Sequence, residues 1–588
     1  MSEQTQRIVN SLTEGVAARG MRFFLQAALA AALLSGYAVA RFRGLSDPQA
    51  MELAQLARGM AEGRGFATHC LRPLDLALLR DVRGAAPQPD ACPDTRHAPA
   101  LPALAAAGFK FLRPSFEAPL AGSLFQPETR VLVPLGILLT LLTTALINLT
   151  ARRLFDPLVA WLASAAYLVT DGVMSDAMSG TALPLMTALG AAAVYAAVLS
   201  VQSRIDRRPV LAWLGLLAGA AALAGTAMLA GYSMWTLVAV VALFGASGGP
   251  RGRLGTCLLV IALAAGVVTP WLWRNVTQTG HLFGTALYGL LHETALYPGT
   301  TVDGLTEPSF HNVLVSLALR AKAFTGLTNA YGSLANAWGS GPLLALFAAS
   351  FVHVFRRREA NQLRWWGGAG LLLMLGVAVL GPRGSGAALR VYLPLAAVFG
   401  AAFFWDLTDR ILIEDAWKTA ASWLFVLLAG LPALLNATVT GPASPYPPYY
   451  PPFIAYAGGL LEPQEVMATD VPWATAWYAG RASVALPATP AELETMSASW
   501  HPVAAVYLTP ATTDRPYARD LVDGDWRAWA PLIDGRIPEG FPLRYAIRLP
   551  PDSASQIFYS DRIRWKEAPA ALAEEIDSGF RLRPEEKR

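Results

Sequence analysis

Apolar residues along this 588-residue chain gather into blocks that recur from Phe23 to Leu435 and then stop. Each block is roughly 15 to 20 residues long, which is about the length of helix that a hydrocarbon core of ~30 Å requires. Backbone groups inside such a core cannot bond to water, so the blocks are predicted to be helices. The pattern predicts about eleven spans, near residues 22–40, 131–149, 157–170, 181–200, 210–227, 231–247, 254–270, 340–355, 365–381, 389–405 and 419–438.

Basic residues between the blocks predict how the spans are oriented. They fall on one side of the membrane only if the apolar stretch 210–246 is split at the turn that starts with Gly231, and the positive-inside rule favours that split. The N-terminus is then cytoplasmic and the C-terminus external. The basic clusters are Arg19/Arg22, Arg152/Arg153, Arg204/Arg207/Arg208, Arg251/Arg253, Arg356/Arg357/Arg358 and Arg410/Lys418.

Composition agrees with a membrane protein. Hydrophobic residues make up 54% of the chain and charged residues only 15%, which excludes an ordinary soluble domain. The net charge of +4 is explained by cytoplasmic arginines that face anionic lipid, and nothing indicates a nucleic-acid partner.

These spans divide the chain into a cytoplasmic N-terminus (1–21), a transmembrane domain (22–438) and an external C-terminal domain (439–588). The transmembrane domain includes a first external loop at 41–130 and a second at 271–339. Amphipathic helices are predicted at 48–60 and 101–111, where they suit the membrane interface. The tail has two strand-like runs, 465–469 and 503–508, with a helical stretch at 490–498 between them, which predicts a small α/β domain.

Several signals of other chemistries are absent from the sequence. The tail contains no Walker sequence and no GxGxxG after a strand, and the three cysteines and seven histidines have no metal-ligand spacing, so we expect no metal and no cofactor. Cys70 and Cys92 share the first external loop, where a disulfide is favoured over two free thiols. Cys257 lies in an apolar span.

Asp47 is the first candidate for chemistry, because it stands a few residues after the first span and just before the helix predicted at 48–60. A carboxylate at the membrane surface can act as a base on a substrate that arrives from water while a lipid-borne partner arrives from the bilayer. The same residue, followed by Pro48, is also a good N-cap. The two roles are compatible.

The loop residues resemble those of the C-type glycosyltransferases, in particular the bacterial protein O-mannosyltransferase-like and aminoarabinose transferase-like branches. Asp47, an Ala-rich helix and Gly63-Arg64-Gly65-Phe66 resemble the family's first external loop, and residues 96–102 resemble its Pro-Leu-Tyr-Pro segment. Residues 270–275 (PWLWRN), 390–394 (RVYLP) and 468–481, which begins ATDVPW, resemble later motifs in the family's order.

The resemblance implies an inverting membrane glycosyltransferase that moves a sugar from a polyprenyl-phosphate donor to a glycan, lipid or protein acceptor on the external face of a bacterial inner membrane. Asp47 would be the general base, and Arg274 and Arg390 would bind the donor phosphate through their guanidinium groups. Arginines near helix ends also reach toward lipid headgroups, so that role stays open for both.

The resemblance also implies sugar-binding roles for Asp171, Asp176 and Asn275. The two aspartates lie in a short stretch, 170–179, that is predicted to be an external turn facing the first loop, and capping of that turn is the alternative role. Two other classes remain open for the whole chain. A transporter or flippase of a lipid-linked glycan would require charged or broken helices near the bilayer midplane, and a non-catalytic envelope assembly protein would explain the tail but not the motifs.

Overall fold

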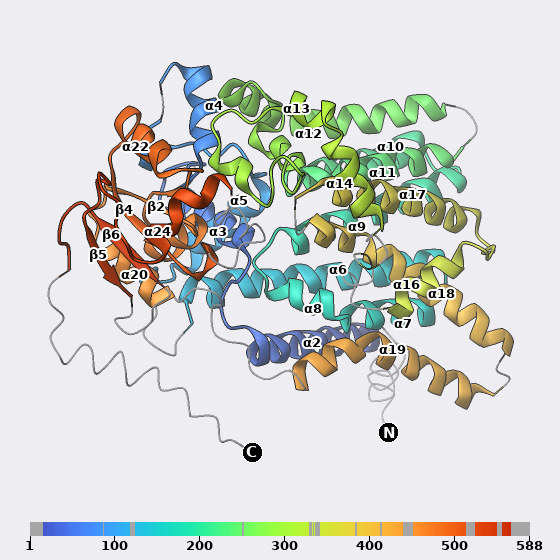
Figure 1. Ribbon diagram of the computed structural model, residues 1–588. Coiled ribbons are helices and arrows are strands. Elements are labelled where there is room, and N and C mark those ends of the chain that lie inside the picture. The colour runs from blue at the N-terminus through green and yellow to red at the C-terminus, as the bar shows by residue number, and fades with distance from the viewer. Residues whose placement is uncertain are drawn as a thin grey trace.

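The computed structural model describes most of the chain as a bundle of long helices with a small sheet at one end (Figure 1). The described residues are 16–85, 87–117, 124–249, 252–328, 332, 334, 341–382, 385–411, 414–438, 451–512, 524–549 and 556–565.

Helices overlap all eleven stretches that the sequence predicts to span. Within the described residues, eight helices are long and apolar enough to cross a membrane, or nine if one bent pair counts as a single span, so the count of eleven is not confirmed. Helices α7, α11 and α16 are each shorter than a full membrane span. The bounds are α2 Val16–Arg41, α6 Val133–Leu154, α7 Pro157–Leu168, α9 Leu183–Ile205, α10 Val210–Met228, α11 Trp235–Ser247, α12 Arg253–Thr279, α16 Gly341–Ser350, α17 Arg358–Leu380, α18 Leu393–Ile411 and α19 Asp415–Thr438.

The bent pair consists of α7 and α8 (Asp171–Met178), whose axes meet at 60°. The sequence predicted a turn at 170–179, and that prediction was wrong: the segment is a short helix that packs against α6. Gly136 of α6 permits this packing, because a methyl group there would overlap the carbonyl of Ala177. Small residues at helix contacts allow backbones in a membrane to approach closely.

Helix α12 passes through Pro270 and ends only at Gly280, which takes a left-handed conformation with φ of 74°. The residues from Trp271 to Asn275 therefore lie on the helix and not at the start of the second loop, which begins about nine residues later than the sequence predicted. Pro270 removes one helical hydrogen bond, but neighbouring helices make such breaks tolerable in membrane proteins.

The first loop, which the sequence predicts to be external, folds into α3 (Pro48–Ala61), β1 (Cys70–Leu71), α4 (Pro73–Arg83) and α5 (Ala100–Leu112). Helix α3 packs against α5, and most of its residues from Ala50 to Ala57 are buried by the loop and by the tail. The helices predicted at 48–60 and 101–111 are therefore present, and much of α3 faces protein.

The tail forms a sheet that it shares with the first loop. The order of the strands is β1-β3-β2-β4-β6-β5. The first four strands in this order run parallel to one another, and β6 runs antiparallel to both β4 and β5. The strand prediction for the tail was right at β2 and β4, and α22 fills the predicted helical stretch. The bounds are α20 Pro451–Gly459, β2 Val466–Thr469, α21 Pro472–Ala474, η7 Thr475–Ala479, β3 Ser483–Ala485, α22 Pro490–Ser499, β4 Val503–Leu508, α24 Ala530–Ile533, β5 Tyr545–Arg548 and β6 Ile557–Ser560.

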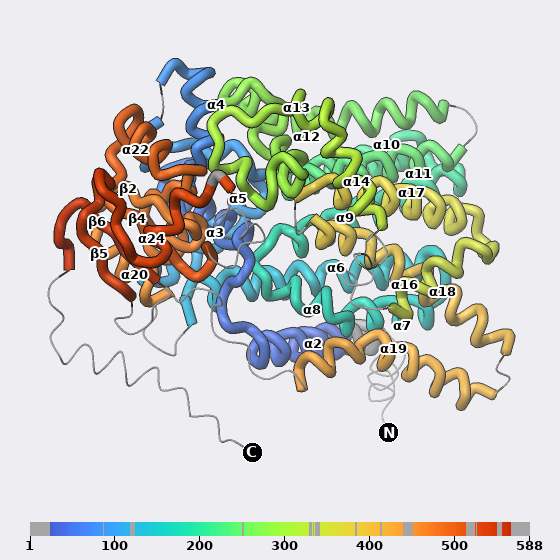
Figure 2. The backbone as a smooth tube through the Cα atoms, viewed as in Figure 1, coloured from blue at the N-terminus to red at the C-terminus, as the bar shows by residue number. Residues whose placement is uncertain are grey.

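The sequence did not predict that β1 completes this sheet. Cys70 and Leu71 pair with Ser483 and Val484, more than 400 residues later in the chain. The tube in Figure 2 shows the same junction: the blue first loop lies against the orange and red tail, and the green second loop lies beside both. The second loop contains η4 Gly284–Leu290, η5 Thr301–Gly304, α13 Phe310–Val315 and α14 Ala318–Thr328.

Candidate functional site

Asp47 is the N-cap of α3. Its carboxylate accepts a hydrogen bond from the backbone amide of Gln49 at 2.8 Å, and Pro48 takes the first helical position, so the capping role is confirmed. The residue stays exposed at the surface, yet desolvation by the protein around it raises the pKa of its carboxyl above the ordinary value. Hydrogen bonds from the Gln49 and Ala50 amides and the positive charge of Arg390 lower the same pKa in part. A carboxylate with a raised pKa is a stronger base than a free one.

Arg390 holds Asp176 in a two-pronged ion pair. Its Nε and Nη2 donate to the two carboxylate oxygens at 2.6 and 2.7 Å, which joins η6 (Ser385–Tyr392) to α8. Both residues lie close enough to Asp47 for the three charges to act on one another. The turn after α8 also touches the segment before Asp47, because a methyl group on Gly180 would lie 2.8 Å from a Leu45 methyl carbon. The structure therefore brings three of the sequence-predicted residues together at the start of α3.

Asp171 is separated from this group. Its carboxylate accepts hydrogen bonds from the Tyr37 hydroxyl and the Asn436 amide, both at 3.0 Å, and so joins α8 to α2 and α19. Asp171 and Asp176, one helical turn and a half apart, thus face different neighbours.

Arg274 lies at another part of the first loop. Its guanidinium donates to the carbonyl of Asp94 at 2.7 Å and stacks over the rings of Trp271 at 4.6 Å and Phe66 at 5.4 Å. Asn275 donates to the Tyr232 hydroxyl at 3.1 Å and to a backbone carbonyl in the loop that follows. The PWLWRN motif therefore fastens the first loop to the end of α12, and Arg274 and Arg390 contact different partners.

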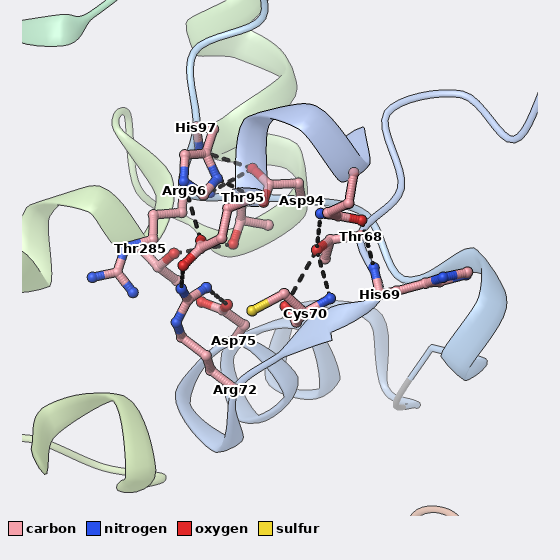
Figure 3. Close-up of polar contacts among 12 residues, drawn as sticks. Thr68, His69, Cys70, Arg72, Asp75, Asp94, Thr95, Arg96, His97 and Thr285 are labelled. Carbon is pink, nitrogen blue, oxygen red and sulfur yellow. Dashed lines mark hydrogen bonds and ion pairs between the residues drawn. The ribbon is translucent and has the colours of Figure 1, made fainter. Parts of the chain in front are cut away.

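A buried network of charges, which the sequence did not reveal, joins three segments around α3. Figure 3 labels Arg72, Asp94 and His97 of this network. Arg72 donates to Glu52 at 2.5 Å and lies 3.4 Å from Asp303 of the second loop. His97 lies 3.2 Å from Glu52 and 3.0 Å from Asp94. The residues come from α3, the loop before α4, the segment 92–97 and η5, and no local spacing in the sequence links them.

Opposite charges set the protonation of this network. Burial lowers the pKa of His97, but Asp94 and Glu52 outweigh burial and raise it to about 9. Burial raises the pKa of Glu52, whereas Arg72 and His97 bring it well below its usual range. The imidazolium and both carboxylates are therefore charged at neutral pH, and each ion has a partner, as buried ions require.

Glu128 makes a second buried connection that the sequence did not reveal. One of its oxygens accepts from the Trp477 indole at 2.9 Å and the Tyr478 hydroxyl at 2.8 Å, both on η7 of the tail. Its other oxygen accepts from the backbone amide of Leu45 at 3.2 Å, two residues before Asp47. The side chain is fully buried. A single carboxyl group thus joins the tail, the short helical segment η2 (Glu128–Leu132) that leads into α6, and the segment that leads to Asp47.

The cysteines are not joined in this structure. Cys70 and Cys92 are free, buried thiols, so the disulfide that the sequence favoured is absent from it. Leu71 and Cys92 pack in one apolar cluster, whereas the neighbouring Cys70, on a strand that alternates its side chains, is not part of that cluster. Within the described ranges, no group of three or more His, Cys, Asp or Glu side chains is arranged to hold a metal ion.

The geometry defines a class: a polytopic helical fold with a carboxylate at the head of a loop helix, a paired arginine beside it and a tail sheet closing over the loop. No family model and no curated protein sequence matches the chain. Solved structures of this fold do match. ArnT from Cupriavidus metallidurans, bound to undecaprenyl phosphate, has 11% sequence identity and a TM-score of 0.53, with 93% of this chain and 99% of that chain covered.

Two structures of an oligosaccharyltransferase from Archaeoglobus fulgidus are also similar. The form tethered to an acceptor peptide has 13% identity and a TM-score of 0.56 over 88% of this chain and 72% of that one. The form in complex with an inhibitory peptide and a dolichol-phosphate, described as AglB, has 12% identity and a TM-score of 0.53 over 93% and 74%. These likenesses show that the chain shares the fold of ArnT and of the oligosaccharyltransferase, as the resemblance in its sequence implied.

Proposed function

We propose that the protein is a membrane glycosyltransferase that moves a sugar from a polyprenyl-phosphate donor to an acceptor on the external face of a bacterial inner membrane. The observation that carries the proposal is the position of Asp47, exposed at the head of α3, with the Asp176–Arg390 pair beside it. The ArnT structure contains undecaprenyl phosphate, and one structure of the oligosaccharyltransferase contains a dolichol-phosphate. Because this chain shares their fold, our hypothesis is that it binds a lipid phosphate of the same kind.

In the proposed reaction, Asp47 takes the proton from the acceptor hydroxyl or amine. The freed electron pair attacks the anomeric carbon from the face opposite the phosphate, the bond from carbon to the phosphate oxygen breaks, and the configuration inverts. The polyprenyl phosphate leaves with that bonding pair. The raised pKa of Asp47 suits this role, because a carboxylate with a higher pKa accepts a proton more readily.

Arg390 stabilises the charge on the leaving phosphate in this scheme. Asp176 fixes the plane of the guanidinium, and a guanidinium held in this way can bind phosphate oxygens without losing further side-chain freedom. Arg274 is the second candidate for the phosphate. Its contacts with Asp94, Phe66 and Trp271 favour instead a role in holding the first loop, and the two roles are distinguishable by the donor KM of a variant.

The experiment compares membranes that contain the native chain, Asp47→Asn or Asp156→Asn at equal expression, each supplied with radiolabelled polyprenyl-phosphate sugars. Asn caps a helix as well as Asp does, so both variants keep their caps. Asp156 is a matched control, because it is also an exposed N-cap followed by proline, at the start of α7. We expect Asp47→Asn to lower label transfer by roughly 10²- to 10⁴-fold and Asp156→Asn to leave it unchanged.

Equal transfer by the native chain and Asp47→Asn would exclude Asp47 as the base. If the native chain transfers label from none of a broad panel of donors, the transporter and assembly-protein hypotheses take precedence.

A further inference from the structure

A cavity of about 180 Å³ lies between the second external loop and the tail, beside Arg72. Residues 293–304 of the loop form one wall, and the ends of β2 and β3 together with Trp473 and Trp526 form the other. The loop is packed tightly onto the tail here, since a methyl group on Gly304 would lie 2.9 Å from the Leu486 carbonyl. One water requires roughly 15 Å³ by the same measure, so the cavity has room for a ring of monosaccharide size.

The charges around the cavity disfavour an anionic ligand. Glu293, Asp303 and Asp470 contribute three carboxylates, against the single guanidinium of Arg72. Arg72 is already shared between Glu52 and Asp303. Arg96 also pairs with Asp303, at 2.9 Å, and the three carboxylates still outnumber the two guanidinium groups. A phosphate or a carboxylate in the cavity would therefore meet a net negative wall.

The remaining lining suits a neutral polyol. Trp473 and Trp526 present indole rings, whose flat apolar faces match the C–H face of a sugar ring. Thr300 and Thr469 add hydroxyl groups, and carboxylate oxygens accept hydrogen bonds from sugar hydroxyls. Buried side chains with defined partners hold the polar wall in place: Asp470, for example, accepts from the backbone amide and the hydroxyl of Thr509 at 3.0 and 2.9 Å.

The cavity is connected to the helix that carries Asp47. Glu52, the partner of Arg72, follows Asp47 by five residues, which corresponds to about 7.5 Å along a helix. Helix α21, which contains Trp473, packs against α3. A ligand in the cavity would therefore lie next to Arg72 and α21, which contact the helix that begins after Asp47.

We propose that this cavity binds a neutral sugar unit of the acceptor, so that the acceptor is a glycan or a glycan-bearing molecule rather than a bare hydroxyl group on a protein or lipid. The inference rests on the proposed function for its role in transfer, but the binding itself does not depend on catalysis.

The test blocks the cavity without removing core contacts. Thr300 lines it and keeps contact with solvent, so Thr300→Trp places an indole in its mouth. Thr306→Trp is the matched control, because it makes the same change at an exposed position of the same loop outside the cavity. Saturation-transfer NMR on the full-length protein in nanodiscs would use methyl glycosides of neutral hexoses and N-acetylhexosamines, with methyl glucuronide as the anionic probe.

We expect at least one neutral glycoside to bind the native chain and Thr306→Trp, to bind Thr300→Trp at least about tenfold more weakly, and methyl glucuronide not to bind. The proposal is overturned if no neutral glycoside binds, if Thr300→Trp binds it as the native chain does, or if the anion binds best. In membranes with Asp47-dependent transfer, Thr300→Trp should raise the acceptor KM and leave the donor KM unchanged. If no Asp47-dependent transfer exists, the proposed function fails, and the glycoside measurement still decides whether the cavity binds sugar.

Discussion

Glu128 gives the sharpest prediction, because its two oxygens serve different parts of the protein. One oxygen accepts from Trp477 and Tyr478 of the tail, and the other accepts from the Leu45 amide. In Glu128→Gln, the amide oxygen can keep the two tail donors, which leaves the new NH₂ group facing the Leu45 N–H. The opposite orientation would lose two hydrogen bonds instead of one. The substitution therefore breaks the connection to the Asp47 segment and keeps the connection to the tail.

The magnitude follows from the lost hydrogen bond. A buried backbone N–H left without an acceptor costs about 1–3 kcal/mol, and the segment 42–47 can regain part of this by moving away from Glu128. A free-energy change of that size alters the ratio between the native and the displaced position of the segment by roughly 5- to 150-fold. A displacement of about 1 Å at a reacting group can lower the rate by about 10²-fold. We expect Glu128→Gln to lower Asp47-dependent transfer by about ten- to a hundredfold.

Tyr478→Phe is the matched variant, since it removes one hydrogen bond from the same carboxyl group but keeps the Leu45 connection. Both variants should lose similar thermal stability, about 1 kcal/mol or somewhat more. The assays are the initial rate of label transfer and hydrogen–deuterium exchange of residues 42–47, which needs no substrate. If Glu128→Gln transfers label as fast as Tyr478→Phe and its 42–47 amides exchange no faster, Glu128 does not position Asp47 and the reasoning is refuted.

Three further predictions concern the surroundings of Asp47. Arg390→Lys should raise the donor KM and lower the transfer rate by about tenfold or more, since lysine cannot reproduce the two-pronged pair with Asp176; steady-state kinetics that match the native values would exclude Arg390 from donor binding. Gly136→Ala should destabilise the protein by about 1–3 kcal/mol, because the methyl group overlaps the Ala177 carbonyl, whereas Gly215→Ala, with open space around it, should be neutral or stabilising; equal melting temperatures would contradict the packing. The pKa of His97 rises on folding from 6.5 to about 9, so its ion pairs stabilise the fold fully below pH 6.5, and up to about 3 kcal/mol of stability is lost as pH rises through 9; thermal unfolding of the native chain and His97→Gln at pH 6 and 10 should show this loss only in the native chain.

Much of the fold was predictable from the sequence, because local patterns determine it. Length and hydropathy placed helices at all eleven apolar stretches, and alternation between apolar runs and turn residues placed β2 and β4. The exceptions have local causes as well. A proline normally ends a helix, yet α12 continues past Pro270 since neighbouring helices support it, and the apolar stretches at α7, α11 and α16 form helices shorter than a full span.

The candidate site was predictable only in part. Asp47 could be found because a cap, a proline and an amphipathic helix follow one another in the sequence, and the contact of Gly180 with Leu45 agrees with the expected position of the 170–179 segment opposite the first loop. The pair of Asp176 with Arg390 was not predicted. The pairing itself spans 214 residues, and that of Glu128 with Trp477 spans 349. Such contacts depend on how the helices and the tail pack against one another. They could not be predicted, because no local spacing in the sequence links the two partners.

The position of Asp47 is fixed from three directions, and this explains why the tail is so closely integrated with the first loop. Glu128 holds Leu45 before it, the α3 cap holds Asp47 itself, and the Glu52 network holds the helix after it. Two of these three restraints end on other segments: the Glu128 carboxyl on Trp477 and Tyr478 of the tail, and the Glu52 network on Asp303 of the second loop. The shared sheet adds β1 to the same junction. A base must be held within a fraction of an ångström of its substrate to be effective, and a surface loop of a membrane protein has no core of its own for that purpose. The tail and the second loop supply that core, so these segments and the proposed base form one structural unit.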